Sequence, residues 1–206
     1  MPPAVDQPYR PWLGYARARG VVRVTAGWTI LSAGMCLIGE LVLHLPSWPG
    51  IAPPVQAHMV LPVFFGLWAA STLHSRMADL EHHAARRMRY WDTAYATTAV
   101  AISAATPWLI TMTTLGTPQA VIAARNSLMW GGLALIAARF LGQQRMWLTV
   151  LLATTATLVT GWNTHSTARP WALPLHLSSS STAAAAAFMC LAVGLACTVS
   201  ADKRRT

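Results

Sequence analysis

The chain has 206 residues, of which 54% are hydrophobic and only 10% are charged, and its formal net charge is +9. Soluble domains carry about 25% charged residues, so this chain lacks the charge for a water-soluble surface, and we expect a helical bundle whose outer face meets lipid. The only lysine is Lys203, which excludes a nucleotide-binding P-loop because that motif needs an internal lysine.

The N-terminal segment, residues 1–24, is expected to lie in the cytoplasmic membrane interface as a short amphipathic helix. Its apolar and small residues fall near helical spacing and alternate with arginines: Tyr9, Trp12, Leu13, Ala16 and Gly20, with Arg10, Arg17 and Arg19 between them. A disordered basic tail attracted to anionic lipid is the alternative.

Six apolar runs approach the roughly 20 residues that a helix needs to cross a membrane. They are residues 25–45, 55–73, 93–113, 120–141, 146–162 and 182–201. Backbone groups in lipid must find their hydrogen bonds within their own segment, so we expect helices. The predicted fold is therefore an all-α polytopic membrane protein with six transmembrane helices, in which Pro62 and Pro107 kink the second and third.

The basic residues are distributed unevenly over the tails and loops between these runs. Thirteen of the 15 lie on one side, and only Arg125 and Arg169 are assigned to the other. Short cytoplasmic loops are enriched in arginine and lysine, so both termini, including the tail 202–206, are predicted to be cytoplasmic. We expect the inner membrane of a bacterium. The short basic clusters between apolar runs argue against nucleic acid as a partner.

Residues 75–92 are predicted to form a charged amphipathic helix on the cytoplasmic side, between the second and third spans. One apolar stripe contains Met77, Leu80, Ala84, Met88 and Trp91. The acidic Asp79 and Glu81 come early and the basic Arg86, Arg87 and Arg89 come late, as the helix dipole favours. This helix is either a solvated connector or a docking element for a cytoplasmic partner.

Two charged residues fall inside the predicted spans at similar depth, Glu40 in the first and Arg125 in the fourth. A charge in a span is costly and usually faces a partner in the bundle interior, so we expect an intramembrane ion pair between them. The alternatives are that Arg125 extends outward to the interface and that Glu40 reaches the interface or is protonated.

Four histidines on the outer side are weak candidates for a metal site: His44, His58, His165 and His176. Their spacing is irregular, and they cluster at the ends of the spans, where a haem would not be held. The cysteines Cys36, Cys190 and Cys197 form no C-x-x-C pair, so no disulfide framework or zinc site follows from them. We expect neither a metal nor a cofactor bound by this chain.

The outer loop, residues 162–181, contains tryptophans and prolines typical of a membrane surface, namely Trp162, Pro170, Trp171 and Pro174. A short re-entrant piece at residues 168–177 and an ordinary anchored loop are both compatible with this composition. No motif of a hydrolytic or redox enzyme is present, so an enzymatic function is not expected.

This layout, with an entry helix, six spans and a charged helix after the second span, resembles the permease subunit of type-2 ABC transporters. The resemblance implies that residues 9–20 form an elbow helix, 75–92 the coupling helix and 164–177 a re-entrant segment. It also implies a separate ATPase partner that binds ATP and magnesium, and a second permease subunit.

The function expected from this resemblance is export of an amphipathic small molecule or peptide. Two alternatives remain: a non-transporting membrane subunit or scaffold of a larger complex, and a metal- or haem-binding membrane protein.

Overall fold

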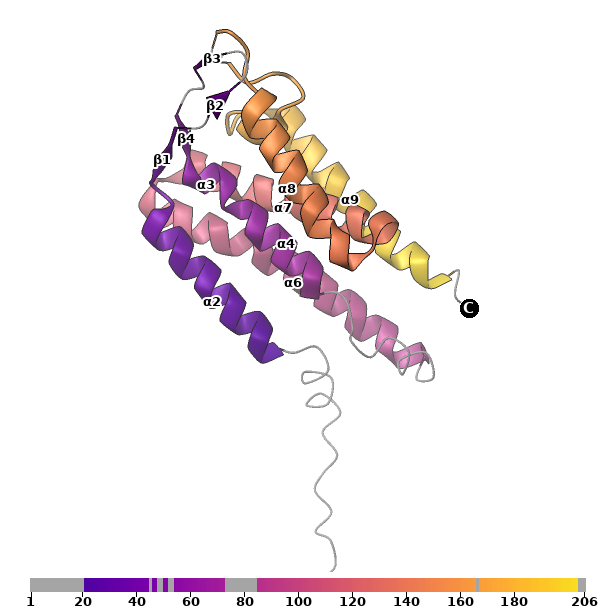
Figure 1. The fold of residues 1–206 in the computed structure, drawn as a ribbon. Helices are drawn as coiled ribbons and strands as arrows, with labels where there is room; N and C mark the ends of the chain where they lie inside the picture. The colour runs from indigo at the N-terminus through magenta and orange to yellow at the C-terminus, as the bar shows by residue number, and fades with distance from the viewer. Residues whose placement is uncertain are drawn as a thin grey trace, which may run out of the picture.

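The computed structural model describes residues 21–44, 46–47, 50–51, 54–72, 85–165 and 167–203, and most of these are helical, which confirms the all-α prediction (Figure 1). The helices are α2 (Val21–Ile38), α3 (Ala57–Val60), α4 (Pro62–Thr72), α6 (Ala85–Thr114), α7 (Thr117–Leu141), α8 (Gln143–Thr160), α9 (Ser181–Lys203) and the 3₁₀ helix η2 (Leu173–Leu175).

Four two-residue strands follow α2 and form two small antiparallel ladders at one end of the bundle. Strand β1 (Val42–Leu43) pairs with β4 (Val55–Gln56), and β2 (Pro46–Ser47) pairs with β3 (Gly50–Ile51). Figure 1 shows the strands and the loop before α9 together at this end, which we call the loop end of the bundle.

The all-α part of the prediction is confirmed, but the six spans are not supported by the described structure. Within the described residues, two helices are long and apolar enough to cross a membrane: Thr117–Leu141 and Ser181–Thr198. The first and second predicted spans correspond to shorter apolar helices, Arg23–Ile38 and Ala57–Thr72. Their length is limited because α2 ends at Ile38, before the strands, and because the second run is interrupted at Leu61.

Pro62 accounts for this interruption. Proline has no backbone N–H and its ring clashes with the carbonyl of the preceding turn, so it starts a helix more easily than it continues one. Accordingly α3 ends at Val60 and α4 begins at Pro62, but Leu61 between them keeps helical backbone angles, so the two segments form one helical stretch, as expected, with an irregularity at Pro62. Pro107, in contrast, lies within the continuous helix α6.

The boundary predicted between residues 92 and 93 falls inside α6. This helix runs for 30 residues from Ala85 to Thr114, so the end of the expected cytoplasmic helix and the third span are one element. Tight turns follow at Gly116 and Gly142, whose φ angles of 90° and 84° lie in the region that glycine adopts without strain. They separate α6 from α7 and α7 from α8.

Helix α7 is the centre of the bundle and contacts α4, α6, α8 and α9. Two adjacent glycines let two helices approach its backbone. A side chain at Gly66 of α4 would lie 2.5 Å from the backbone nitrogen of Gly131, and one at Gly132 would lie 2.5 Å from the backbone of Cys190 on α9. Small residues at such crossings allow the close packing that drives helix association in lipid.

Helix α2 is attached to the bundle through Trp28. Its indole nitrogen donates a hydrogen bond of 2.9 Å to the hydroxyl of Thr106 on α6, and its ring meets Phe65 of α4 edge-on at 5.5 Å between centroids. Edge-to-face aromatic pairs contribute about 0.5–1.5 kcal/mol beyond the area they bury. Trp28 therefore joins three helices.

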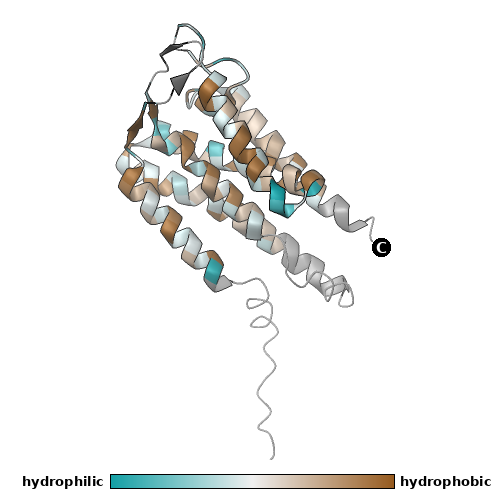
Figure 2. Cartoon of the chain, viewed as in Figure 1, coloured by the Kyte–Doolittle hydropathy of each residue, from teal (hydrophilic) through white to brown (hydrophobic). Residues whose placement is uncertain are grey.

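Large apolar side chains are exposed along the outer faces of the helices. Examples are Ile30, Leu37, Leu152, Phe188 and Met189, each more than 60% exposed. Figure 2 shows hydrophobic residues along the length of α2 and α8. Monomeric soluble proteins rarely expose large contiguous apolar patches, so these exposed side chains are compatible with a lipid or protein environment.

The glycine contact at α7 gives a first testable prediction. Gly132→Ala should destabilise the protein by about 1–3 kcal/mol, because the added methyl group forces α9 away from α7. The matched control is Gly34→Ala, where a Cβ meets nothing within 4 Å and helix propensity should add about 0.5–1 kcal/mol of stability. Thermal unfolding in mild detergent measures both, and equal midpoints for the two variants would contradict the packing.

Candidate functional site

Three consecutive polar residues lie in the otherwise apolar helix α7, near the loop end. Arg125 is 6% exposed, and Asn126 and Ser127 are fully buried. We call them the polar triplet. Each member bonds a different part of the molecule, so together they connect α7 to the outer loop, to α3 and to α6.

Arg125 points its guanidinium at the outer loop around η2. It donates to the carbonyl oxygens of His176 at 2.8 Å and of Leu177 at 3.0 Å. Longer bonds reach the carbonyls of Leu173 at 3.3 Å and Pro174 at 3.4 Å. Guanidinium has five N–H donors in a rigid fork, so one side chain can bond several carbonyls of the same turn.

Asn126 links this turn to the second helical segment. Its Nδ2 donates to the carbonyl oxygens of Met59 on α3 and of Pro174, both at 3.0 Å. Its Oδ1 accepts from Arg125, from Nε at 3.4 Å and Nη2 at 3.5 Å. Both ends of the amide are therefore used, as a fully buried amide requires.

Ser127 completes the triplet by joining α7 to α6. Its hydroxyl donates to the carbonyl oxygen of Ser103 at 2.6 Å. Both serines are buried, and Ser103 in turn bonds the carbonyl of Val100 within its own helix at 2.7 Å.

The outer loop folds on itself above the triplet. Arg169 donates its backbone N–H to the carbonyl of Gly161 at 2.8 Å, and Trp162 forms an isolated bridge with Ala168. A ring nitrogen of His176 lies 3.0 Å from the carbonyl oxygen of Arg169. Within the loop Ala172, Pro174 and Leu175 are buried, so this segment is part of the packed structure.

The predicted ion pair between Glu40 and Arg125 is not formed. Glu40 is exposed in the turn after α2, and it is not among the partners of Arg125, which are the outer-loop carbonyls and Asn126. The two residues lie at the same end of the bundle as expected. Backbone carbonyls of the loop, rather than a carboxylate, satisfy the guanidinium.

The four outer histidines do not come together. Among the described residues no three His, Cys, Asp or Glu side chains are grouped as a metal site would need. His44 and His165 are exposed, and His176 bonds within the outer loop. His58 is fully buried in α3, and neither ring nitrogen has a hydrogen-bond partner.

Some of the residues predicted for partner docking lie outside the described residues, and the others lie at the start of α6. Met77, Asp79, Leu80 and Glu81 lie outside the described residues. Arg86, Arg87, Met88 and Trp91 lie in the first two turns of α6, where the backbone is described and the side chains are not. Their predicted role stays a prediction.

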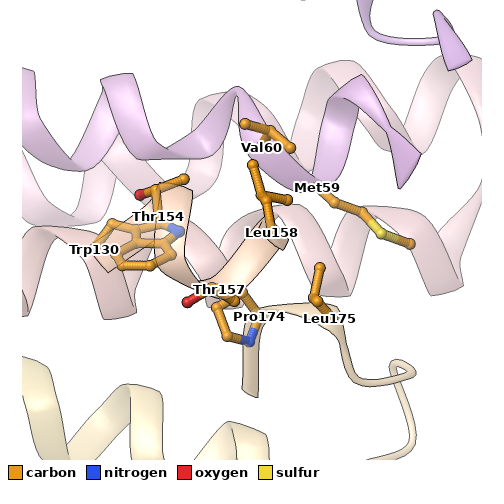
Figure 3. A pocket seen from close by; sticks show the side chains of 8 residues that line it. All are labelled: Met59, Val60, Trp130, Thr154, Thr157, Leu158, Pro174 and Leu175. Carbon is orange, nitrogen blue, oxygen red and sulfur yellow. The ribbon is translucent and has the colours of Figure 1, made fainter. Parts of the chain in front are cut away.

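A cavity lies beside the polar triplet, between α3, α7, α8 and η2 (Figure 3). It is partly open, and its enclosed part is about the size of one water molecule. The lining residues are Met59, Val60, Trp130, Thr154, Thr157, Leu158, Pro174 and Leu175. Met59 and Pro174, whose carbonyls bond Asn126, form part of its wall, so the triplet holds two sides of the cavity in place.

Sequence reasoning named Arg125 but missed the roles of Asn126, Ser127 and Trp130. The run Arg-Asn-Ser inside an apolar span was the available indication, because three consecutive polar residues on a helix point in three directions and each needs a partner. Trp130 carried no such indication, since the sequence does not show what faces its indole N–H.

Comparison with known proteins gave no relative: no family model matches the sequence, no curated protein is significantly similar, and no solved structure matches the chain.

The polar triplet gives a second testable prediction. Arg125→Leu should destabilise the outer loop, because the carbonyl of His176 would lose its donor and a buried carbonyl without a donor costs about 1–3 kcal/mol. Hydrogen exchange of residues 167–180 in detergent should then accelerate about tenfold or more, since 1.4 kcal/mol corresponds to a factor of ten. Arg139→Leu, an exposed arginine on the same helix, is the control. Unchanged protection in Arg125→Leu would contradict the assignment.

Proposed function

We propose that this chain is an integral membrane protein that acts as the permease subunit of a transporter powered by a separate ATPase. One observation carries the proposal: the basic residues gather at the end of the bundle opposite the loop end. The resemblance in layout to type-2 ABC permeases suggests how such an end would be used.

Several helix termini meet at this basic end. Arg23 near the start of α2, Arg139 in the last turn of α7 and Arg145 in the first turn of α8 are all exposed. Figure 1 shows these termini at the same end as the start of α6 and the end of α9. The start of α6 contributes Arg86, Arg87 and Arg89, and the end of α9 contributes Lys203. By the positive-inside rule, this end faces the cytoplasm.

Helix lengths support a membrane position for the bundle. At 1.5 Å per residue, the 25 residues of α7 span about 37 Å, enough for a hydrocarbon core of about 30 Å. The shorter α2 and the pair α3 and α4 would cross with local thinning of the bilayer. We propose on this basis that all six apolar runs cross the membrane, with both termini in the cytoplasm.

Helix α6 is longer than a bilayer requires. Its 30 residues span about 45 Å, so about ten residues extend beyond the hydrocarbon core. If its apolar C-terminal part is embedded, the extension is the basic first part that contains Arg86, Arg87, Met88 and Trp91. We propose that this extension, with residues 75–84 before it, docks on the cytoplasmic ATPase and transmits its movement to α6.

The described cavity is too small to be the transport path. Its enclosed part is about the size of one water molecule, far below the 300–1,000 Å³ of typical small-molecule sites, so it does not serve as a path for an amphipathic substrate. We therefore place the path between this chain and a second permease subunit. The same small cavity favours the alternative of a non-transporting membrane subunit, and copurification separates the two.

The proposed topology gives a third prediction. In a background with Cys36, Cys190 and Cys197 replaced by serine, Asn163→Cys in the outer loop should react with a membrane-impermeant maleimide in intact cells. Gln144→Cys at the basic end should react only after permeabilisation, because the positive-inside rule places it in the cytoplasm. Equal labelling of the two positions in intact cells would contradict the topology.

Partner docking gives a fourth prediction. The chain purified from its native host in mild detergent should be accompanied by a nucleotide-binding protein with ATPase activity. Combined Arg86→Glu and Arg87→Glu should lower the recovered ATPase about tenfold or more, because like-charge contacts at an interface cost several kcal/mol.

Arg139→Glu, a charge reversal at the same end on α7, is the matched control and should retain the partner. Recovery of the wild-type chain without any nucleotide-binding protein would overturn the permease proposal and leave the scaffold alternative.

A further inference from the structure

Two arginines lie on either side of the connection between α7 and α8, at the basic end; we call residues 139–148 the α7–α8 turn. Arg139 precedes Gly142 by three residues and Arg145 follows it by three, so each lies about 4.5 Å along its helix axis from Gly142, at a similar depth. Both side chains are exposed, and neither bonds or pairs with any described residue. Their charge and their N–H donors are therefore available to an external anion.

Large apolar side chains lie next to these arginines in the chain and are exposed with them. Phe140 is 75% exposed, Leu141 50% and Trp147 51%. Figure 2 shows hydrophilic residues, in teal, beside hydrophobic ones, in brown, at this turn. Cations beside exposed aromatic rings are typical of a membrane interface, where headgroups meet the cations and acyl chains meet the rings.

The bundle holds the α7–α8 turn in position. Gln143 donates from Nε2 to the carbonyl oxygen of Ser71, at the end of α4, at 3.0 Å. Met146 is 5% exposed and belongs to the hydrophobic core around α7. Because Met146 packs inward, its exposed neighbours Arg145 and Trp147 are directed to the surface. The surface is therefore formed before a ligand binds.

Helix length favours a lipid over a cytoplasmic protein as the partner of this turn. Helix α8 has 18 residues and spans about 27 Å, close to the hydrocarbon thickness of about 30 Å. In the proposed membrane position, its first turn reaches the headgroups and goes no further. Helix α6, with its 30 residues, is the element that extends beyond them.

We propose that the α7–α8 turn binds an anionic phospholipid, whose phosphate lies between Arg139 and Arg145. Its acyl chains extend along Phe140 and Trp147. An anionic headgroup is favoured over a choline headgroup, which would bring a third cation to the two arginines. Glu40, the only acidic residue whose side chain the structure describes, lies at the loop end and does not neutralise them (Figure 1). The proposal rests on the proposed membrane position and is independent of the ATPase.

The test uses a phosphatidylglycerol that carries a diazirine at the start of one acyl chain. It is titrated onto the purified full-length chain in mild detergent, photolysed, and located by peptide mass spectrometry. We expect labelling within residues 139–148. Half-maximal labelling should need about tenfold less of this lipid than of a phosphatidylcholine with the same diazirine, because each arginine beside an anionic lipid strengthens binding about fivefold.

Variants connect the labelling to the two arginines. Combined Arg139→Gln and Arg145→Gln should raise the half-maximal concentration of the phosphatidylglycerol about tenfold or more. Combined Arg23→Gln and Arg169→Gln is the matched control, because it removes the same charge from the start of α2 and from the outer loop. Unfolding midpoints show whether each variant is folded. Arg139→Lys with Arg145→Lys keeps the charge and should retain the lipid preference, which decides the test if the glutamine pair does not fold.

Three results would overturn the proposal. The first is an equal half-maximal concentration for the two lipids. The second is competition by inorganic phosphate as effective as that by unlabelled phosphatidylglycerol, which would assign the arginines to a free anion. The third is loss of the copurified ATPase from the glutamine pair with lipid labelling unchanged, which would assign the turn to the protein partner. Failure of the topology has a separate readout, the reaction of Gln144→Cys in intact cells.

Discussion

The buried guanidinium of Arg125 and the irregular outer loop each depend on the other. Arginine keeps its charge in proteins, and a charge taken out of water needs several hydrogen bonds to replace its hydration. In the loop around η2, the carbonyl oxygen of His176 accepts from Arg125 and from no other described donor, and in a bilayer such a group must be satisfied by protein. The contacts at His176 and Leu177 meet both needs at once. These hydrogen bonds fix the position of the loop, and with it one wall of the cavity.

Helix α7 can hold the bundle together because its faces differ. Toward α4 and α9 it presents Gly131 and Gly132, which permit backbones to touch. One to two turns earlier along the chain it presents the polar triplet, which fixes the loop end through directional bonds. The glycines allow close approach, and the directional hydrogen bonds to the carbonyls of Met59 and Ser103 fix how α7 is rotated. The triplet therefore sets the orientation that the glycines allow.

The two ends of the molecule differ in what they present. The first part of α6, at the basic end, is the surface proposed for the ATPase. The loop end contains the rigid cavity, held by Asn126 and lined by Trp130. Helix α7 runs between them and contacts α6, α8 and α9, so movement applied at α6 would pass through a packed core. Such a core transmits displacement because it is close-packed.

Much of the fold follows from the sequence. The run predicted at 120–141 corresponds to α7, and the run at 182–201 corresponds to α9, because both are long, strongly apolar and free of proline beyond the first turn. Glycines at positions 116 and 142 mark the ends of α7 in the sequence and adopt the positive φ that such turns use. Hydropathy and helix termination are local properties, so a single sequence contains them.

Only the tertiary structure decided which partner each polar group found. Arg125 was expected to pair with Glu40, and it instead binds carbonyls about 50 positions further along the chain. The indole of Trp130 faces two threonines of α8 across the cavity, and the carbonyl of Met59 accepts from Asn126. The sequence by itself determined that these groups needed partners, because burial in an apolar helix implies it. Which oxygen meets which donor depends on how the helices rotate and cross, and only their packing fixes that.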